Sequence, residues 1–189
     1  TTTRMERLKY VERGWAHLTQ GAVAGLEVLV AYHYLRGDSG GIAQAKRFLD
    51  RVAMIDHEIG YVGLMVDVEN PDKPNPPWHV PTYRQILLDF LAYVRGATTR
   101  RCLVYGPGSY LPTLTLPAEI ADLHPLMLAD WTPPYPVPAP WKDVTIHQYE
   151  VKVVDRDRYD GTIAELRQAL GLDRVSLADA HLGALAETI

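Results

Sequence analysis

The chain has 189 residues, of which 47% are hydrophobic and 22% are charged, and its formal net charge at pH 7 is −4. This length and composition are typical of a globular protein with one substantial core, so we expect a single domain over residues 1–189. The acidic balance lacks the basic footprint of nucleic-acid binding, and no apolar stretch approaches the roughly 20 residues of a membrane span. Cys102 is the only cysteine, which excludes an internal disulfide and a cysteine-based metal cluster.

Helix-like and strand-like segments alternate along the chain. The first is a predicted helix that begins at a capping box of Thr3 and Glu6 and ends near Gly21 or Gly25. Six later segments are short apolar runs bounded by turn residues, which is the pattern of buried strands. They cover residues 26–34, 61–69, 101–105, 126–130, 144–149 and 151–155.

Apolar residues at helical spacing predict helices between and after these strands. A capping box of Thr82 and Gln85 begins one helix, and Thr162 with Glu165 begins another that Gly171 closes. The predicted helices cover residues 42–52, 82–96, 117–123, 162–171 and 176–188.

This alternation predicts an α/β fold, in which helices lie outside a parallel sheet. We expect residues 173–189 to form a C-terminal helical extension, and the proline-rich segments 70–81 and 131–141 to be loops of the same domain. Polar and aromatic residues gather at the carboxyl ends of the strands, as is typical of an α/β barrel. The functional site is therefore expected at that edge of the sheet.

Asp67 and Glu69 close the second of these strands and are the leading candidates for catalysis. Burying two acids at the end of an apolar run costs free energy, so their presence there indicates a functional role. Residues two apart share one face of a strand, so their Cβ atoms lie roughly 6–7 Å apart. The pair fits glycoside hydrolysis, which needs one protonated carboxyl and one ionised carboxylate. We predict that Glu69 is the acid and Asp67 the ionised partner.

The other strand ends carry residues typical of a sugar site. Aromatic faces stack on pyranose rings, while carboxylates and amides bind hydroxyl groups. If the strands are parallel, these residues converge on one rim, to which Asp155 adds a further acid. The predicted substrate-binding residues are Tyr32, His33, Tyr105, Asp130, Trp131, Gln148 and Tyr149.

Seven segments follow one another in the order found in a known family. They are Ala31-Tyr-His-Tyr34, Gln44-Ala45 with Phe48, Met65-Val-Asp-Val-Glu69, Leu103-Val-Tyr-Gly-Pro107, residues 126–131, Ile146-His-Gln-Tyr149 and Val154-Asp-Arg-Asp-Arg-Tyr-Asp-Gly161. Together they resemble the glycoside hydrolase family 25 lysozymes, which carry a Tyr-His-Phe strand end and a signature Asp-x-Glu. That family usually has Trp where this chain has His147.

The resemblance implies a distorted TIM-like (β/α) barrel that acts on peptidoglycan glycan strands without a metal or other cofactor. The family's general acid is the Glu of Asp-x-Glu, which is Glu69 here. Its accompanying Asp, here Asp67, orients or stabilises the acetamido group of the substrate, and Asp155 matches a third acid of the catalytic site. The implied activity is that of a bacteriolytic N-acetylmuramidase, which cleaves the β-1,4 bond between N-acetylmuramic acid and N-acetylglucosamine.

Members of that family begin with a strand that carries another acid, in a Gly-x-Asp-x-Ser-x-Trp-like segment. This chain starts at about the next helix, so we expect the first strands to come from a missing N-terminal segment or from another chain. The first residues contain no signal peptide. We expect a protein that is secreted, or delivered by phage, to the bacterial cell wall.

Two other functions compete with hydrolysis by a carboxylate pair. One is a non-catalytic glycan-binding or structural descendant that keeps the cleft and lacks turnover. The other is a metal-dependent hydrolase that uses His33, Asp67, Glu69 and His147, although the chain lacks a His-x-His or His-Glu-x-x-His pair.

Overall fold

The computed structural model describes residues 28–59, 62–69, 79–151 and 155–172, which build a six-stranded sheet. The strands are neighbours in chain order, and the first five run parallel. The sixth strand is antiparallel to the fifth. The strands are β1 Leu29–Tyr34, β2 Val62–Asp67, β3 Cys102–Pro107, β4 Leu126–Ala129, β5 Ile146–Val151 and β6 Asp155–Arg158.

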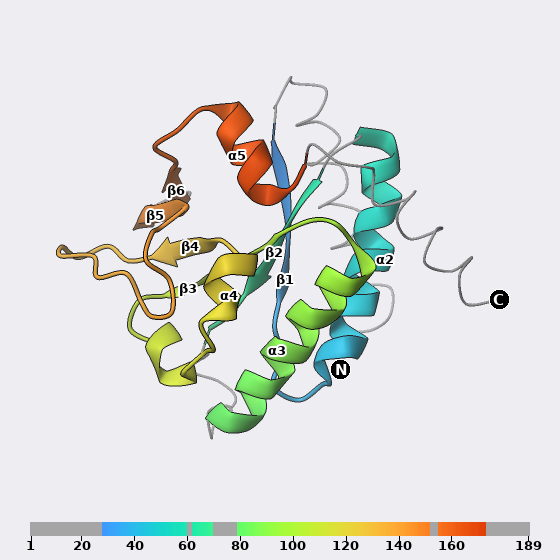
Figure 1. Ribbon diagram of the computed structural model, residues 1–189, viewed down its shortest axis with the longest axis horizontal. Helices are drawn as coiled ribbons and strands as arrows, with labels where there is room; N and C mark the ends of the chain where they lie inside the picture. The colour runs from blue at the N-terminus through green and yellow to red at the C-terminus, as the bar shows by residue number, and fades with distance from the viewer. Residues whose placement is uncertain (1–27, 60–61, 70–78, 152–154, 173–189) are drawn as a thin grey trace.

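Helices connect the first four strands and cover the sheet, whereas a loop connects β4 to β5 (Figure 1). The two longest, α2 and α3, pack against each other on its outer face. The short helix α5 lies at the amino ends of the strands, where the backbone N–H of Arg101 donates to the carbonyl of Leu170 at 3.1 Å. The helices are α2 Gly41–Ile59, α3 Val80–Ala97, the 3₁₀ helix η1 Leu111–Leu114, α4 Glu119–Leu123 and α5 Ile163–Leu170.

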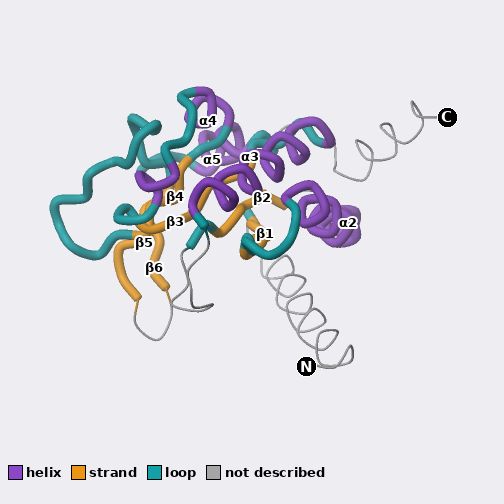
Figure 2. The backbone as a smooth tube through the Cα atoms, turned by 90° about the horizontal axis from the view of Figure 1, so that it is seen from below, coloured by secondary structure: helices purple, strands orange, loops and turns teal. Residues whose placement is uncertain are grey.

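The sheet curls into half of a barrel (Figure 2), which confirms the prediction of a distorted α/β barrel. Only the two ends of the predicted strand 151–155 are described: β5 continues to Val151, and Asp155 begins β6, which runs antiparallel to β5. The predicted helices before residue 28 and over 176–188 lie outside the described residues.

The outer face of the sheet is closed by apolar packing against α2 and α3. Alternate residues of β2, namely Val62, Leu64 and Val66, are completely buried there. The helices approach closely at Gly41, where an added Cβ would lie only 2.1 Å from the carbonyl oxygen of Ile86. Any side chain at this position would therefore push α2 and α3 apart. Cys102 belongs to the same core, and burial raises the pKa of its thiol.

A smaller apolar cluster fills the inner face at the amino ends of the strands. Its buried members are Leu103, Met127, Leu166, Leu170 and Leu172. Helix α5, which supplies part of it, begins at the predicted cap: the Thr162 hydroxyl accepts from the backbone N–H of Glu165, and the Glu165 carboxylate accepts from that of Thr162. The helix ends at Gly171, whose φ of 68° favours glycine. This helix therefore closes the amino end of the inner face.

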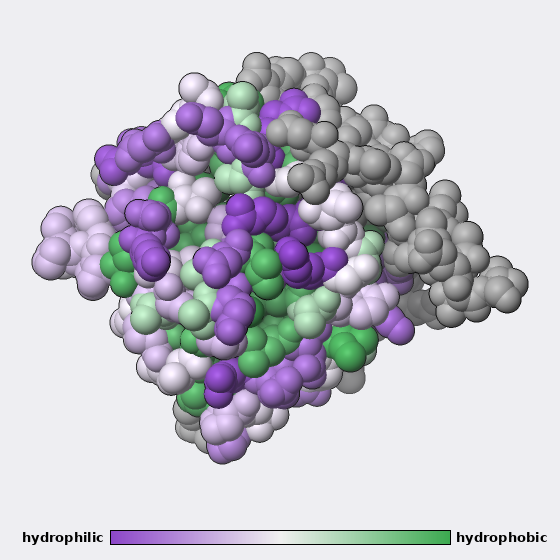
Figure 3. Space-filling model, in the orientation of Figure 1, coloured by the Kyte–Doolittle hydropathy of each residue, from purple (hydrophilic) through white to green (hydrophobic). Residues whose placement is uncertain are grey.

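The surface in Figure 3 is mostly polar, with an apolar area near its centre between α3 and α4. Apolar atoms contribute much of any folded protein's surface, so this area needs no special explanation. Over the ranges that the structure describes, no helix is both long enough and apolar enough to cross a membrane.

Candidate active site

The acid pair lies at the carboxyl end of β2, within a row of side chains that crosses three strands. In sheet register, Asp67 is opposite Tyr34 of β1 and Tyr105 of β3. Val68 is buried in the outer core, so Asp67 and Glu69 on either side of it face inward. The fold therefore brings both predicted catalytic acids to the inner face, beside two tyrosines.

Both carboxyl groups hold a proton more strongly than they would in water. Burial, followed by the charge of Glu69, raises the pKa of Asp67 to about 7. Burial also raises the pKa of Glu69. Oδ1 of Asp67 is buried and has no hydrogen-bond partner in the described part of the chain, which makes its charge costly. The pair can therefore supply a proton near neutral pH, as acid catalysis requires.

The prediction that Glu69 is the acid and Asp67 the ionised partner stays a prediction, because the pKa values of both carboxyls are raised. The larger rise in pKa is at Asp67, which has one enclosed oxygen, whereas Glu69 lies two residues further along the chain, past the end of the strand. Because the two groups interact, their titration belongs to the pair.

Two predicted substrate-binding residues are joined beside the acid pair. The hydroxyl of Tyr105 donates to Oε1 of Gln148 at 2.9 Å, and the Gln148 side chain is buried. This bond assigns the amide oxygen, so the NH₂ group of Gln148 is left to act as a donor. A buried amide held in one orientation is a suitable group for recognising a sugar oxygen.

His33 lies on the outer face, since strand alternation turns it away from Tyr32 and Tyr34. Its ring stacks on Phe90 with 5.3 Å between ring centroids, and its Nε2 donates to Oε1 of Gln44 at 3.0 Å. Burial lowers the pKa of His33 and favours the neutral ring. The structure thus places His33 on the outer face of the sheet, away from the groups that face Asp67.

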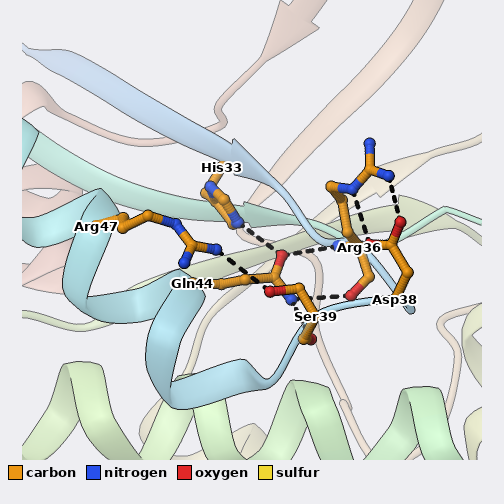
Figure 4. A network of polar contacts seen from close by, with 6 residues as sticks. All are labelled: His33, Arg36, Asp38, Ser39, Gln44 and Arg47. Atoms are coloured by element: carbon orange, nitrogen blue, oxygen red, sulfur yellow. Dashed lines mark hydrogen bonds and ion pairs between the residues drawn. The ribbon is translucent and has the colours of Figure 1, made fainter. Parts of the chain in front are cut away.

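Gln44 holds His33 and the segment after β1 in place through four hydrogen bonds (Figure 4). Its Nε2 donates to the carbonyls of Arg36 at 2.8 Å and Ser39 at 2.7 Å, while Oε1 accepts from the backbone N–H of Arg36 as well as from His33. All four hydrogen-bonding positions of this buried amide are therefore used. The network fixes the chain just beyond β1, and with it Tyr34 in register beside Asp67.

His147 and Tyr149 also lie away from the acid pair. His147 is the register partner of Leu128, an outer-core residue, and its Nε2 donates to the carbonyl of Asp130 at 2.8 Å. The ring of Tyr149, which is 40% exposed, lies 6.4 Å from that of His147. The four residues of the metal-dependent alternative consequently do not converge. Among the described residues, no group of three or more His, Cys, Asp or Glu side chains could hold a metal ion.

The remaining predicted residues lie on β1, just after β4 and at the start of β6. Tyr32 is 63% exposed and Trp131 is 52% exposed, so both can stack on a ligand. Asp130 follows β4 and is half-buried. Asp155 begins β6 opposite Val151, at the carboxyl end of β5, and the structure describes only its backbone.

Three tyrosines near the pair are absent from the predicted site. Burial and then the charges of the two carboxylates raise the pKa of Tyr34, so its phenol lies close to both. Tyr83 and Tyr110 stand behind it, with 6.3 Å between their ring centroids. Burial and a neighbouring Tyr34 raise the pKa of Tyr110. Alternation along β1 could have revealed Tyr34, whereas α3 and η1 offer no comparable signal for the other two.

Comparison with known families identifies the chain. Residues 6–157 match glycosyl hydrolases family 25. The chain belongs to this family. The predictions of the family and of a glycosidase are therefore confirmed. A comparison with curated proteins gave no match.

Solved structures of lysozymes and muramidases have a similar fold. The bacterial lysozyme from Streptomyces coelicolor is 24% identical, with a TM-score of 0.68, and the match covers 84% of this chain and 78% of that one. The family 25 lysozyme from Aspergillus fumigatus is 25% identical, with a TM-score of 0.68 and coverage of 82% and 78%. The muramidase from Trichobolus zukalii is 20% identical, with a TM-score of 0.64 and the same coverage.

Proposed function

We propose that this protein is a muramidase that hydrolyses the β-1,4 bond between N-acetylmuramic acid and N-acetylglucosamine in peptidoglycan. The observation that carries the proposal is the inward-facing pair Asp67 and Glu69, whose pKa values are raised at the carboxyl end of β2. Membership of family 25 supports it, and so do the names of the similar structures, which are lysozymes and muramidases.

Glu69 protonates the leaving oxygen in this proposal, because it lies nearest the rim. Asp67 supports the positive charge that develops on the sugar or holds the acetamido group, and the charge of Glu69 beside it keeps a proton within the pair. Asp155 would assist from the start of β6, at the carboxyl end of β5. No step requires a cofactor.

Substrate recognition would combine stacking with hydrogen bonds. Tyr32 and Trp131 are exposed aromatic side chains, and the pair of Tyr105 and Gln148 presents an oriented amide beside the acids. Asp130 adds a carboxylate for sugar hydroxyl groups. The proposed partner is thus a peptidoglycan glycan strand, met at the bacterial cell wall after secretion or phage delivery.

Replacement of Glu69 by Gln tests the assignment. The amide keeps the shape of the side chain but cannot donate the proton, so we expect clearing of purified cell walls to fall by about 10²–10⁴-fold with the fold unchanged. Glu119→Gln is the matched control, since Glu119 is an exposed carboxylate on α4. Unchanged clearing by Glu69→Gln would contradict the proposal. Wild-type protein that binds glycan without releasing reducing ends would instead support the non-catalytic alternative.

A further inference from the structure

A hollow of about 360 Å³ lies beside β4, β5 and β6 and contains none of the residues proposed for the acid pair's cleft. Its lining includes Leu128, Tyr135, Thr145, His147, Arg158 and Asp160. Tyr135 comes from the proline-rich loop between β4 and β5, which projects from this end of the molecule in both ribbon views (Figures 1 and 2).

The sheet separates this hollow from the acid pair. Leu128, His147 and Arg158 are consecutive register partners across β4, β5 and β6. The adjacent partners Met127 and Ile146 belong to the inner cluster, so these three lining residues face the opposite side, and only Tyr159, just after β6, both lines the hollow and packs against the inner cluster. A ligand in the hollow would therefore leave the inner face accessible.

The lining has the chemistry of a saccharide site. Tyr135 is 38% exposed and packs edge-on against His147 with 4.5 Å between ring centroids, which leaves part of its ring for stacking. Because Nε2 of His147 donates to the Asp130 carbonyl, only Nδ1 of the ring is left for a contact with a ligand. Arg158 and Asp160 add donors and acceptors at the mouth, where both are exposed.

The charge balance favours a neutral ligand. Nε of Arg158 lies 3.2 Å from a carboxylate oxygen of Asp160, so the two charges offset each other. A phosphate or carboxylate would meet Asp160 as well as Arg158, whereas sugar hydroxyls can accept from one and donate to the other. The volume lies at the lower end of the range for small-molecule sites, which fits a ligand of one or two sugar units.

We propose that this hollow is a second, non-catalytic saccharide-binding site that holds a glycan strand away from the acid pair. That the strand is peptidoglycan rests on the proposed function. The probe is the tetramer of β-1,4-linked N-acetylglucosamine, titrated into the Glu69→Gln protein so that it is not consumed. Amide NMR signals of residues 145–147 and 158–160 should shift on addition of the tetramer. The combined change Tyr135→Ala and Arg158→Ala should weaken this binding by about tenfold.

Arg156→Ala is the matched control, because Arg156 is another exposed arginine of β6 with an ion pair of its own, to Glu150 at 3.4 Å, and it does not line the hollow. It should leave the tetramer affinity unchanged. Shifts confined to the row around Asp67, no shifts at all, or equal affinity in the double variant would overturn the second site. Shifts at the hollow in a protein whose wild type fails to hydrolyse cell walls would retain the second site and remove only the proposed hydrolysis.

Discussion

The two faces of β2 differ although they share one stretch of chain. Outward, Val62, Leu64 and Val66 are completely buried against helices. Inward, the strand ends at Asp67, a carboxyl whose enclosed oxygen has no partner among the described residues and whose pKa is about 7. The outer side chains stabilise the fold, and the inner carboxyl is held in a state that costs stability.

This difference predicts which substitutions in β2 should affect stability and which should affect catalysis. Alternation gives neighbouring residues opposite environments, so a change on one face can be made with little effect on the other. Stability and catalysis should consequently be separable by mutations only one residue apart.

The largest expected effect is on the outer face. Leu64→Ala removes a completely buried side chain and leaves a cavity, so the free energy of unfolding should fall by about 2–5 kcal/mol. Denaturant titration measures this loss, and activity per folded molecule should change little. Met65→Ala is the neighbouring control on the inner face, where Met65 is only partly buried and should cost less. Equal losses from the two variants would contradict the contrast between the faces.

Asp67→Asn should increase the free energy of unfolding at high pH. The folded pKa of Asp67, about 7, exceeds its unfolded value of roughly 4, so the folded protein binds more protons between these values. Stability is therefore lost as pH rises through this window. The variant has no carboxyl to ionise at this position. Above pH 7 its free energy of unfolding should therefore exceed that of the wild type by on the order of 1–2 kcal/mol, after allowance for solvent screening.

The measurement is denaturant unfolding of both proteins from pH 4 to pH 8. The difference between them should be small at pH 4 and grow up to pH 7. A difference in the free energy of unfolding that stays constant with pH would show that burial and Glu69 do not raise the pKa of Asp67. Activity should fall by about 10²-fold or more, since the variant has lost a carboxyl of the pair.

The smallest expected effect concerns Tyr34, which stands where the family pattern has Phe. Its phenol is neutral and close to both carboxylates, so it can stabilise their ionised forms by donating a hydrogen bond. Tyr34→Phe should move the alkaline limb of the activity profile upward by a fraction of a pH unit and change the maximal rate by less than about threefold. Tyr93→Phe on α3 serves as the control. A displacement of the limb to lower pH would contradict this role.

The strands, and the position of the acid pair at a strand end, could be predicted because buried positions of a strand are apolar in the sequence. The run that ends in Asp67 and Glu69 is apolar up to the point where the chain reaches the rim. The cap at Thr162 was equally predictable, since it depends on residues three apart.

Register, and the direction of the last strand, were not predictable from local patterns. Nothing in the residues between Val151 and Asp155 distinguishes a continued strand from a reversal, so β6 was missed as an antiparallel strand. His33 was grouped with Tyr32 at one strand end, although alternation places them on opposite faces, and only its packing on Phe90 shows which face is which. Near Gln148, an irregularity in the pairing of β5 with β6 further obscures the alternation.

Cys102 is the sole thiol of the chain, and it lies completely enclosed within the outer core. Burial raises its pKa, so the reactive thiolate is scarce while the protein is folded. A water-soluble thiol reagent can therefore label the molecule only when this core opens. The rate of labelling would then report the frequency of that opening in native buffer, with a probe that the chain already carries.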